Sequence, residues 1–152
     1  MKRVVITSDP FEPEQLAKSF RDIAGDIGAI ASFAGYVRGE AGAVETLRLS
    51  HYPGMTEAQI DRMIETMLSR WDITVCHITH RVGDMATGEA IVYVTAASAH
   101  RRDAFQAVDF MMDYLKSEAP FWKQELGPSG AVWIEPREQD KTDIERWNKG
   151  LK

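Results

Sequence analysis

The sequence contains little that would mark a secreted, fibrous or membrane-spanning protein. Its 152 residues include one cysteine, Cys76, so no disulfide can form within the chain, which favours a reducing compartment. The apolar run at the N-terminus ends at Ser8 and Asp9 and is too short for a signal peptide or a membrane span. Internal repeats and low-complexity segments are also missing. We therefore expect one domain over residues 1–152 that stays in the cytoplasm.

An excess of positive charge is also missing. The chain has 18 Lys and Arg against 23 Asp and Glu, which gives a formal net charge of −5. The averaged field of such a protein repels nucleic-acid backbones and anionic membrane surfaces, so any anion site must be a local cluster of cations. The sequence contains no GxGxxG, Walker, GxSxG or HExxH motif, and no cofactor is predicted.

Three helices are predicted from hydrophobic periodicity. The first covers residues 13–25, with Leu16, Phe20 and Ile23 on one stripe, and stops at Gly25. The second covers residues 56–71 and has an expected capping box of Thr56 and Gln59. The third is capped by Ser98 and ends by Ala119, because Pro120 disfavours helical angles in its predecessor. Its predicted buried stripe contains Phe105, Val108, Met112 and Leu115.

The β-rich runs predict a first strand over residues 3–8 and then three hairpins. The hairpins pair residues 29–39 with 44–52, 73–83 with 89–98, and 121–126 with 131–136. Antiparallel hairpins packed with two or three helices indicate the α+β class.

The polar C-terminal segment allows two interpretations. From about residue 138 to residue 152 it is a polar tail that could be mobile, or it forms a docked helix. Its few apolar residues, Ile144, Trp147 and Leu151, are the ones that could dock.

Two lysines lie in the most aromatic part of the chain, "FMMDYLKSEAPFWKQE" at residues 110–125. Lys116 is expected in the last turn of a helix, where backbone carbonyls favour a cation, and Lys123 on an extended segment beyond Pro120. The two ammonium groups should therefore lie near each other. Aromatic neighbours lower the local dielectric, which favours the neutral form of a lysine. The same surroundings strengthen the attraction between a charged lysine and an anion. The simpler alternative, two solvated lysines, stays open at this point.

A second basic cluster, "SAHRRDAF", places His100, Arg101 and Arg102 in the first turn of a helix. Cations oppose the helix dipole there, so they either gain from binding an anion or remain in water. A continuous helix separates His100 from Lys116 by about 24 Å, so one small ligand cannot touch both in one chain. We expect a twofold dimer to bring the two ends together.

Other candidates are weaker. Arg38 ends a strand beside a glycine-containing loop, and Arg137 follows the last strand, so each could contact an anion or be solvated. His77 and His80 should point to opposite faces of a strand, so no metal site is predicted. Cys76 is expected to be a small buried hydrophobe.

Four motifs together resemble one known family. They are "HYPGMT", "SAHRRDAF", "FMMDYLKSEAPFWKQE" and "WIEPRE", within a similarity that runs from about Phe33 to Arg137. In this order and spacing they resemble the large, catalytic subunit of molybdopterin synthase. The resemblance implies a hammerhead-like α/β fold within the α+β class.

The activity implied by the resemblance is sulfur transfer in molybdenum cofactor biosynthesis. A sulfurtransferase of this kind converts cyclic pyranopterin monophosphate, also called precursor Z, to the dithiolene molybdopterin. The sulfur comes from the C-terminal Gly-Gly thiocarboxylate of a small ubiquitin-like subunit. The implied assembly is a heterotetramer around a homodimer of the large subunit, whose pocket lies near the dimer interface.

The resemblance also implies roles for particular residues. Lys116 and Lys123 correspond to essential lysines of the family. The implied anion-binding residues are Arg38, His100, Arg101 and Arg137. The side chains that could wall a channel for the tail are Phe33, Phe121 and Trp122, although core packing explains each equally well.

Two other functions compete with sulfur transfer. A non-catalytic module could bind a Gly-Gly tail and use the lysines to hold its carboxylate. A nucleotide or RNA binder could use the same cations with aromatic stacking, but the net acidity argues against it. A nucleic-acid groove would lose affinity steeply with salt, whereas a buried tail would not.

Overall fold

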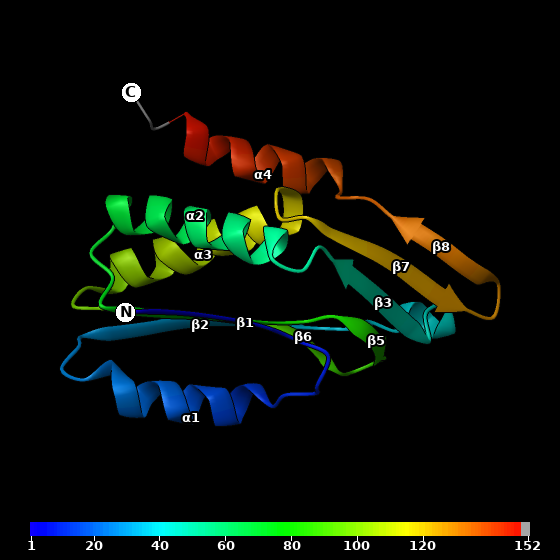
Figure 1. Ribbon diagram of the computed structural model, residues 1–152, viewed down its shortest axis with the longest axis horizontal. Helices are drawn as coiled ribbons and strands as arrows, with labels where there is room; N and C mark the ends of the chain where they lie inside the picture. Colours follow the sequence, from blue (N-terminus) through cyan, green and yellow to red (C-terminus); the bar gives the residue numbers. More distant parts are fainter. Residues whose placement is uncertain (150–152) are drawn as a thin grey trace.

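The structure is a computed structural model that describes residues 1–149 (Figure 1). Its helices are α1 (Pro13–Ala24), α2 (Met55–Arg70), α3 (Arg101–Ser117) and α4 (Glu138–Asn148), with a short 3₁₀ turn at Glu40–Gly42. Its strands are β1 (Lys2–Thr7), β2 (Ala29–Tyr36), β3 (Thr46–His51), β4 (Val75–Arg81), β5 (Gly83–Ala86), β6 (Ala90–Ser98), β7 (Phe121–Gly127) and β8 (Gly130–Ile134). The α+β class is confirmed.

The first sheet has the order β1-β4-β6-β2 and is antiparallel except for the parallel pair β1 and β4. Helices α2 and α3 cover one face and α1 covers the other (Figure 1). The main core lies beneath α2 and α3, where Ile60, Met67 and Met111 pack with Ile78 and Val94. Alternation along β4 and β6 sends every second side chain into this core.

The second sheet, β5-β3-β7-β8, has a small core of its own. Leu47, Leu49 and Met85 are buried there, and Phe121 packs against them. Because β7 starts shortly after α3 ends, the second sheet holds Lys123 close to the helix end that carries Lys116. No helix within residues 1–149 is long and apolar enough to cross a membrane.

One predicted hairpin is wrong. Residues 29–39 and 44–52 do not pair, because β2 pairs with β6 in the first sheet and β3 pairs with β5 and β7 in the second. Glu40 and Ala41 adopt positive φ angles in the connection, which carries the chain from one sheet to the other. The pairing of β4 with β6 and that of β7 with β8 are confirmed. The expected loop at residues 84–88 contains part of β5, which joins the second sheet.

Both predicted helix caps are also wrong. Gly54, at φ 87°, precedes α2, and its N–H donates to the Glu57 carboxylate at 2.6 Å. Thr56 is instead buried inside the helix, and its hydroxyl donates to the Pro120 carbonyl at 3.2 Å. His100 precedes α3, while the Ser98 hydroxyl donates to the Asp72 carbonyl at 2.7 Å.

Two of the predicted stripe residues are exposed. Ile23 faces solvent at the end of α1, and Phe105 is 63% exposed near the start of α3. Their neighbours Ala24 and Ala104 are buried, so the buried face of each helix is rotated away from the predicted residue. Val108, Met112 and Leu115 further along α3 are buried as expected.

The C-terminal segment forms a docked helix as far as Asn148. The Arg146 guanidinium bridges Asp109 and Asp113 of α3, each at 2.7 Å. Trp147 packs edge-on against Trp71 and Phe110. Leu151, the third apolar residue of the segment, lies outside the described residues.

Candidate active site

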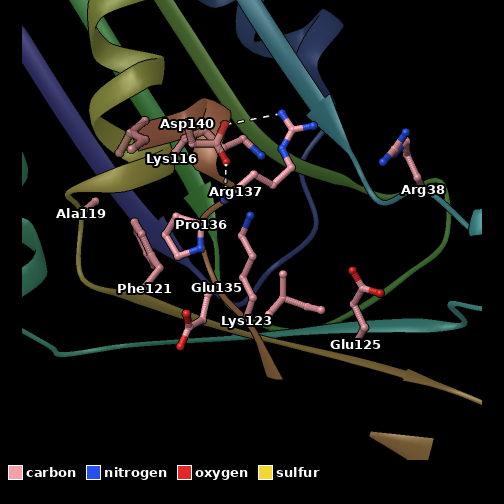
Figure 2. Close-up of a pocket in the computed structure, with 12 residues that line it drawn as sticks. Arg38, Lys116, Ala119, Phe121, Lys123, Glu125, Glu135, Pro136, Arg137 and Asp140 are labelled. Carbon is pink, nitrogen blue, oxygen red and sulfur yellow. Dashed lines mark hydrogen bonds and ion pairs between the residues drawn. The ribbon is translucent and has the colours of Figure 1, made fainter. Parts of the chain in front are cut away.

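A cavity of about 430 Å³ lies where the end of α3 meets β7 and the connection from β8 to α4 (Figure 2). Four cations line it: Arg38, Lys116, Lys123 and Arg137. Three carboxylates line it as well: Glu125, Glu135 and Asp140. We call this cavity, defined by these seven charged residues, the polar chamber. Its positive excess is local in a chain of net charge −5, as an anion site in an acidic protein requires.

A second cavity of about 380 Å³ adjoins the first. Its apolar lining includes Phe33, Tyr36, Leu49, Val92 and Met112, and we call it the apolar chamber. The two chambers share Arg38, Leu115, Lys116, Phe121 and Lys123. Both lysines therefore lie at the boundary between a charged space and an apolar one.

Local structure explains how the two lysines meet. Lys116 lies in the last turn of α3, directly after the buried Leu115. The chain turns at Pro120 and enters β7, where alternation sends Phe121, Lys123 and Glu125 to the chamber side. The structure brings the two lysines together as predicted, because both side chains line the polar and the apolar chamber.

Trp122 does not share this position. It lies between Phe121 and Lys123 in β7 and faces the other side of the sheet, where its ring contacts Tyr52 edge-on at 4.8 Å. Of the three predicted wall residues, Phe33 and Phe121 line the apolar chamber, whereas Trp122 lines neither chamber.

The electrostatics of Lys123 are unusual for a lysine. Burial lowers its pKa to about 8, and the positive charge of Lys116 acts in the same direction. The carboxylates of Asp140 and Glu125 oppose the shift without cancelling it. A lysine with such a pKa has a substantial neutral fraction near neutral pH and can accept or donate a proton there.

The two arginines of the polar chamber are exposed and paired. Arg38 is 81% exposed and bridges Glu40 at 2.8 Å, next to the 3₁₀ turn. Arg137 is 75% exposed and contacts Asp140 at 3.5 Å. Each guanidinium is therefore largely in solvent, where an anion entering the chamber can reach its N–H donors.

His80 is a chamber residue that the sequence did not indicate. It lines the apolar chamber, and its ring stacks on Phe121 with centroids 4.1 Å apart. Burial lowers its pKa to about 4, so the ring is neutral at pH 7. Its Nδ1 lies 2.9 Å from the Arg81 carbonyl, which can only accept, so Nδ1 carries the hydrogen.

His77 and His80 face opposite sides of β4, as predicted. His77 contacts Phe20 of α1 edge-on at 5.1 Å, away from the chambers. Within residues 1–149 no group of three or more His, Cys, Asp or Glu side chains is arranged to hold a metal ion. Cys76 is buried, and burial raises the pKa of its thiol to about 11, so it is an unreactive core residue as expected.

The helix-start cluster lies apart from the chambers. His100 and Arg101 are exposed at the opposite end of α3 from Lys116, and neither lines the polar or the apolar chamber. The structure thus brings together Lys116, Lys123, Arg38 and Arg137, and leaves His100 and Arg101 outside. The helix between His100 and Lys116 is continuous, which is the condition on which their predicted separation depends.

The fold and the paired lysines define a small α+β protein with a cationic pocket suited to an anionic substrate. The family model described as MoaE protein matches residues 6–118, and the chain belongs to this family. The chain is 49% identical over 146 residues to the molybdopterin synthase catalytic subunit of Caulobacter vibrioides, covering 96% of this chain and 97% of that protein. It is 40% identical over 151 residues to the subunit of the same name from Escherichia coli, with 95% and 97% covered.

Solved structures agree with these relatives. The fold matches the molybdopterin biosynthesis MoaE protein of Burkholderia ambifaria with a TM-score of 0.82 and 39% identity, covering 97% of this chain and 99% of that one. It also matches molybdopterin synthase from Staphylococcus aureus with a TM-score of 0.73 and 27% identity, covering 86% and 94%. The resemblance found in the sequence motifs is confirmed.

Proposed function

We propose that this chain is the catalytic subunit of a molybdopterin synthase, a sulfurtransferase of molybdenum cofactor biosynthesis. It converts cyclic pyranopterin monophosphate to dithiolene molybdopterin with sulfur from a small subunit's C-terminal thiocarboxylate. The observation that carries the proposal is the position of Lys116 and Lys123 at the wall common to the polar and apolar chambers. The similarity to catalytic subunits over nearly the whole chain supports it.

Each chamber suits one reactant. The polar chamber has four cations, and Arg38 and Arg137 can meet a phosphate with two parallel N–H donors each. The apolar chamber suits a narrow Gly-Gly tail whose sulfur must reach the lysines, with Phe33 and Phe121 as its walls. A water-poor surrounding also strengthens the attraction between the lysines and the reacting anions.

The chemistry requires two steps for each sulfur. First, the thiocarboxylate sulfur forms a bond to a side-chain carbon of the pterin, and an oxygen substituent leaves as water after taking up a proton. Lys116 supplies that proton or stabilises the acyl intermediate. Water then attacks the acyl carbon, the acyl–sulfur bond breaks, and the small subunit leaves as a carboxylate while sulfur stays on the pterin.

Lys123 can serve as the base for the water step. Its pKa of about 8 lets it take a proton from the attacking water near neutral pH. As an ammonium it stabilises the negative charge that develops on the acyl oxygen. Two sulfurs are added, so the cycle runs twice with a fresh tail.

The assembly is part of the proposal. His100 and Arg101 of a second copy complete the anion site across a homodimer, and one small subunit joins each protomer to give a heterotetramer. The whole chain, residues 1–152, acts as one domain. We expect it to work in the cytoplasm, where the free Cys76 stays reduced.

The proposal is tested by anaerobic conversion of cyclic pyranopterin monophosphate. The protein is mixed with a thiocarboxylated small subunit, and the dithiolene product and the released carboxylate form of the subunit are both measured. We expect two small subunits to be consumed for each molecule of dithiolene product. No product should form when the small subunit's tail ends in an ordinary carboxylate. If the protein bound the tail but formed no product, sulfur transfer would be rejected in favour of a non-catalytic module that binds the Gly-Gly tail.

A further inference from the structure

His80 is a buried polar side chain on the wall of the apolar chamber. The residue is only 6% exposed, and it lines this chamber together with Val92, its cross-strand neighbour in β6. Its ring is neutral at pH 7, because burial lowers its pKa to about 4. The reaction steps proposed above give it no role, although it shares the chamber with both lysines.

Two contacts fix the orientation of the His80 imidazole. Nδ1 donates to the Arg81 carbonyl at 2.9 Å, and one face of the ring stacks on Phe121 at an interplanar angle of 13°. Arg81 is held in turn by the ion pair of its guanidinium with Glu89 at 3.2 Å. Because Nδ1 carries the hydrogen, Nε2 presents a lone pair that can only accept.

The Nε2 atom of His80 is unpartnered and open. Within residues 1–149 it accepts no hydrogen bond. It is not sealed inside the protein either, since the enclosed side-chain atoms of these residues that lack a partner are Arg70 Nε and Arg81 Nε. The cavity that His80 lines is the apolar chamber, so Nε2 opens into it. A buried acceptor without a partner costs free energy, which a donor on a ligand recovers.

The apolar chamber has few other side-chain acceptors. Its remaining side chains are apolar apart from the Tyr36 hydroxyl and the cationic groups of Arg38, Lys116 and Lys123. A peptide that enters the chamber brings backbone N–H groups, and each one that loses its water needs an acceptor. A carboxylate at this position would repel an anionic tail, whereas a neutral imidazole accepts a hydrogen bond without adding charge.

We propose that His80 is a tail-binding residue of the apolar chamber, whose Nε2 accepts a backbone N–H of the Gly-Gly tail. The bond sets how far the tail enters, so that its terminal carbon reaches the wall shared by Lys116 and Lys123. Glycine suits such a contact, because a residue without a Cβ lets the backbone approach the chamber wall closely. This inference rests on the proposed function for the identity of the tail.

A purely structural role is the alternative. The Nδ1–H bond and the stack on Phe121 stabilise the core whether or not a tail binds. The two ring nitrogens separate these roles, because Nδ1 serves the fold and Nε2 serves the ligand. Asparagine places an N–H near the position of Nδ1, whereas glutamine places a carbonyl oxygen near that of Nε2. The two substitutions therefore form a matched pair.

The test measures binding of a small subunit that ends in an ordinary Gly-Gly carboxylate and so cannot transfer sulfur. Calorimetry gives its Kd for wild type, His80→Asn and His80→Gln, and a small subunit that lacks its last two residues is the control. We expect His80→Asn to bind the intact subunit about tenfold more weakly and the truncated one unchanged. His80→Gln should bind the intact subunit within about threefold of wild type, although it loses the bond to Arg81 and unfolds at a lower temperature. Affinities that instead fall in the order of the melting temperatures would overturn the proposal.

A change in the tail tests the same bond without altering the protein. Semisynthetic small subunits carry an ester in place of the amide of either terminal glycine, which replaces an N–H by an oxygen. One of the two esters should weaken binding to wild type about tenfold and should cost His80→Asn nothing further. No loss with either ester, or equal losses for both proteins, would reject this inference alone. If wild type did not bind the small subunit at all, the proposed function would be rejected together with it.

Discussion

Burial and the neighbouring cation Lys116 both lower the pKa of the Lys123 amine. The unfolded chain holds the proton with an ordinary pKa near 10.5, whereas the folded pKa is about 8. The unfolded state therefore binds more protons between about pH 8 and pH 10.5, and stability rises with pH in that window. At pH 7 the full penalty of the buried charge is present.

Lys123→Met should therefore stabilise the protein while removing its activity. We expect the free energy of unfolding at pH 7 to rise by about 1–2 kcal/mol, after allowing for partial solvation. The rise in stability above pH 8 should disappear in the variant. Urea unfolding at pH 7 and pH 9.5 measures both effects, and Lys141→Met, at an exposed lysine of α4, is the control. A variant less stable than wild type at pH 7 would contradict the assigned environment of Lys123.

Some residues of the chambers could be predicted from the sequence, and others could not. Lys116 and Lys123 could be predicted because a helix end, Pro120 and a strand follow one another closely. His80 could not, because it reaches the apolar chamber from β4, which is distant in sequence from both lysines. Trp122 differs from its neighbour Phe121, because strand alternation places it on the other face of β7, where it contacts Tyr52 and lines neither chamber.

At the scale of elements, local patterns predicted strands and helices better than their partners. Strand β3 follows β2 closely in sequence, yet it joins β7, because Leu47 and Leu49 complete the small core with Met85. A short sequence distance favours a hairpin only when both strands share one core. The cap of α2 was misplaced because the positive φ of Gly54 begins the helix one residue before Thr56.

Gly127 illustrates a constraint that only the packed elements reveal. A Cβ at this position would lie 2.0 Å from the Ala43 carbonyl oxygen, which belongs to the backbone and cannot turn aside. The adjacent Glu45 N–H donates to the Leu126 carbonyl at 2.9 Å, so the two segments cannot separate without losing this bond.

We expect Gly127→Ala to destabilise the second sheet by about 2 kcal/mol or more. Ser129→Ala, in the exposed turn of the same hairpin, should change stability by about 0.5 kcal/mol or less. Thermal unfolding of both variants measures the difference. Equal melting temperatures would mean that the hairpin tolerates a shift away from Ala43.

At the scale of the whole molecule, α3 separates two sets of cations that the proposed reaction needs together. Lys116 opens onto the chambers, whereas His100 lies at the far end of the helix. A second copy is the simplest way to bring His100 to a chamber. The sequence predicted this separation from helix geometry alone, because only the length of a continuous helix was needed.

Mixed dimers test the shared site. His100→Ala and Lys116→Ala should each be inactive or nearly so alone, but subunit exchange creates dimers with one intact pocket. Random exchange restores about a quarter of the wild-type sites, so about a quarter of the activity should return. If each chain formed its own complete pocket, exchange would restore nothing.

The central claim is that the lysine pair at the chamber boundary carries sulfur transfer. The most direct measurement is anaerobic conversion of cyclic pyranopterin monophosphate by wild type and Lys116→Ala, each with the same thiocarboxylated small subunit. The account predicts dithiolene product from wild type alone, while both proteins unfold cooperatively at similar temperatures because the buried stripe of α3 is untouched. Product formed by Lys116→Ala at a near-normal rate would contradict it.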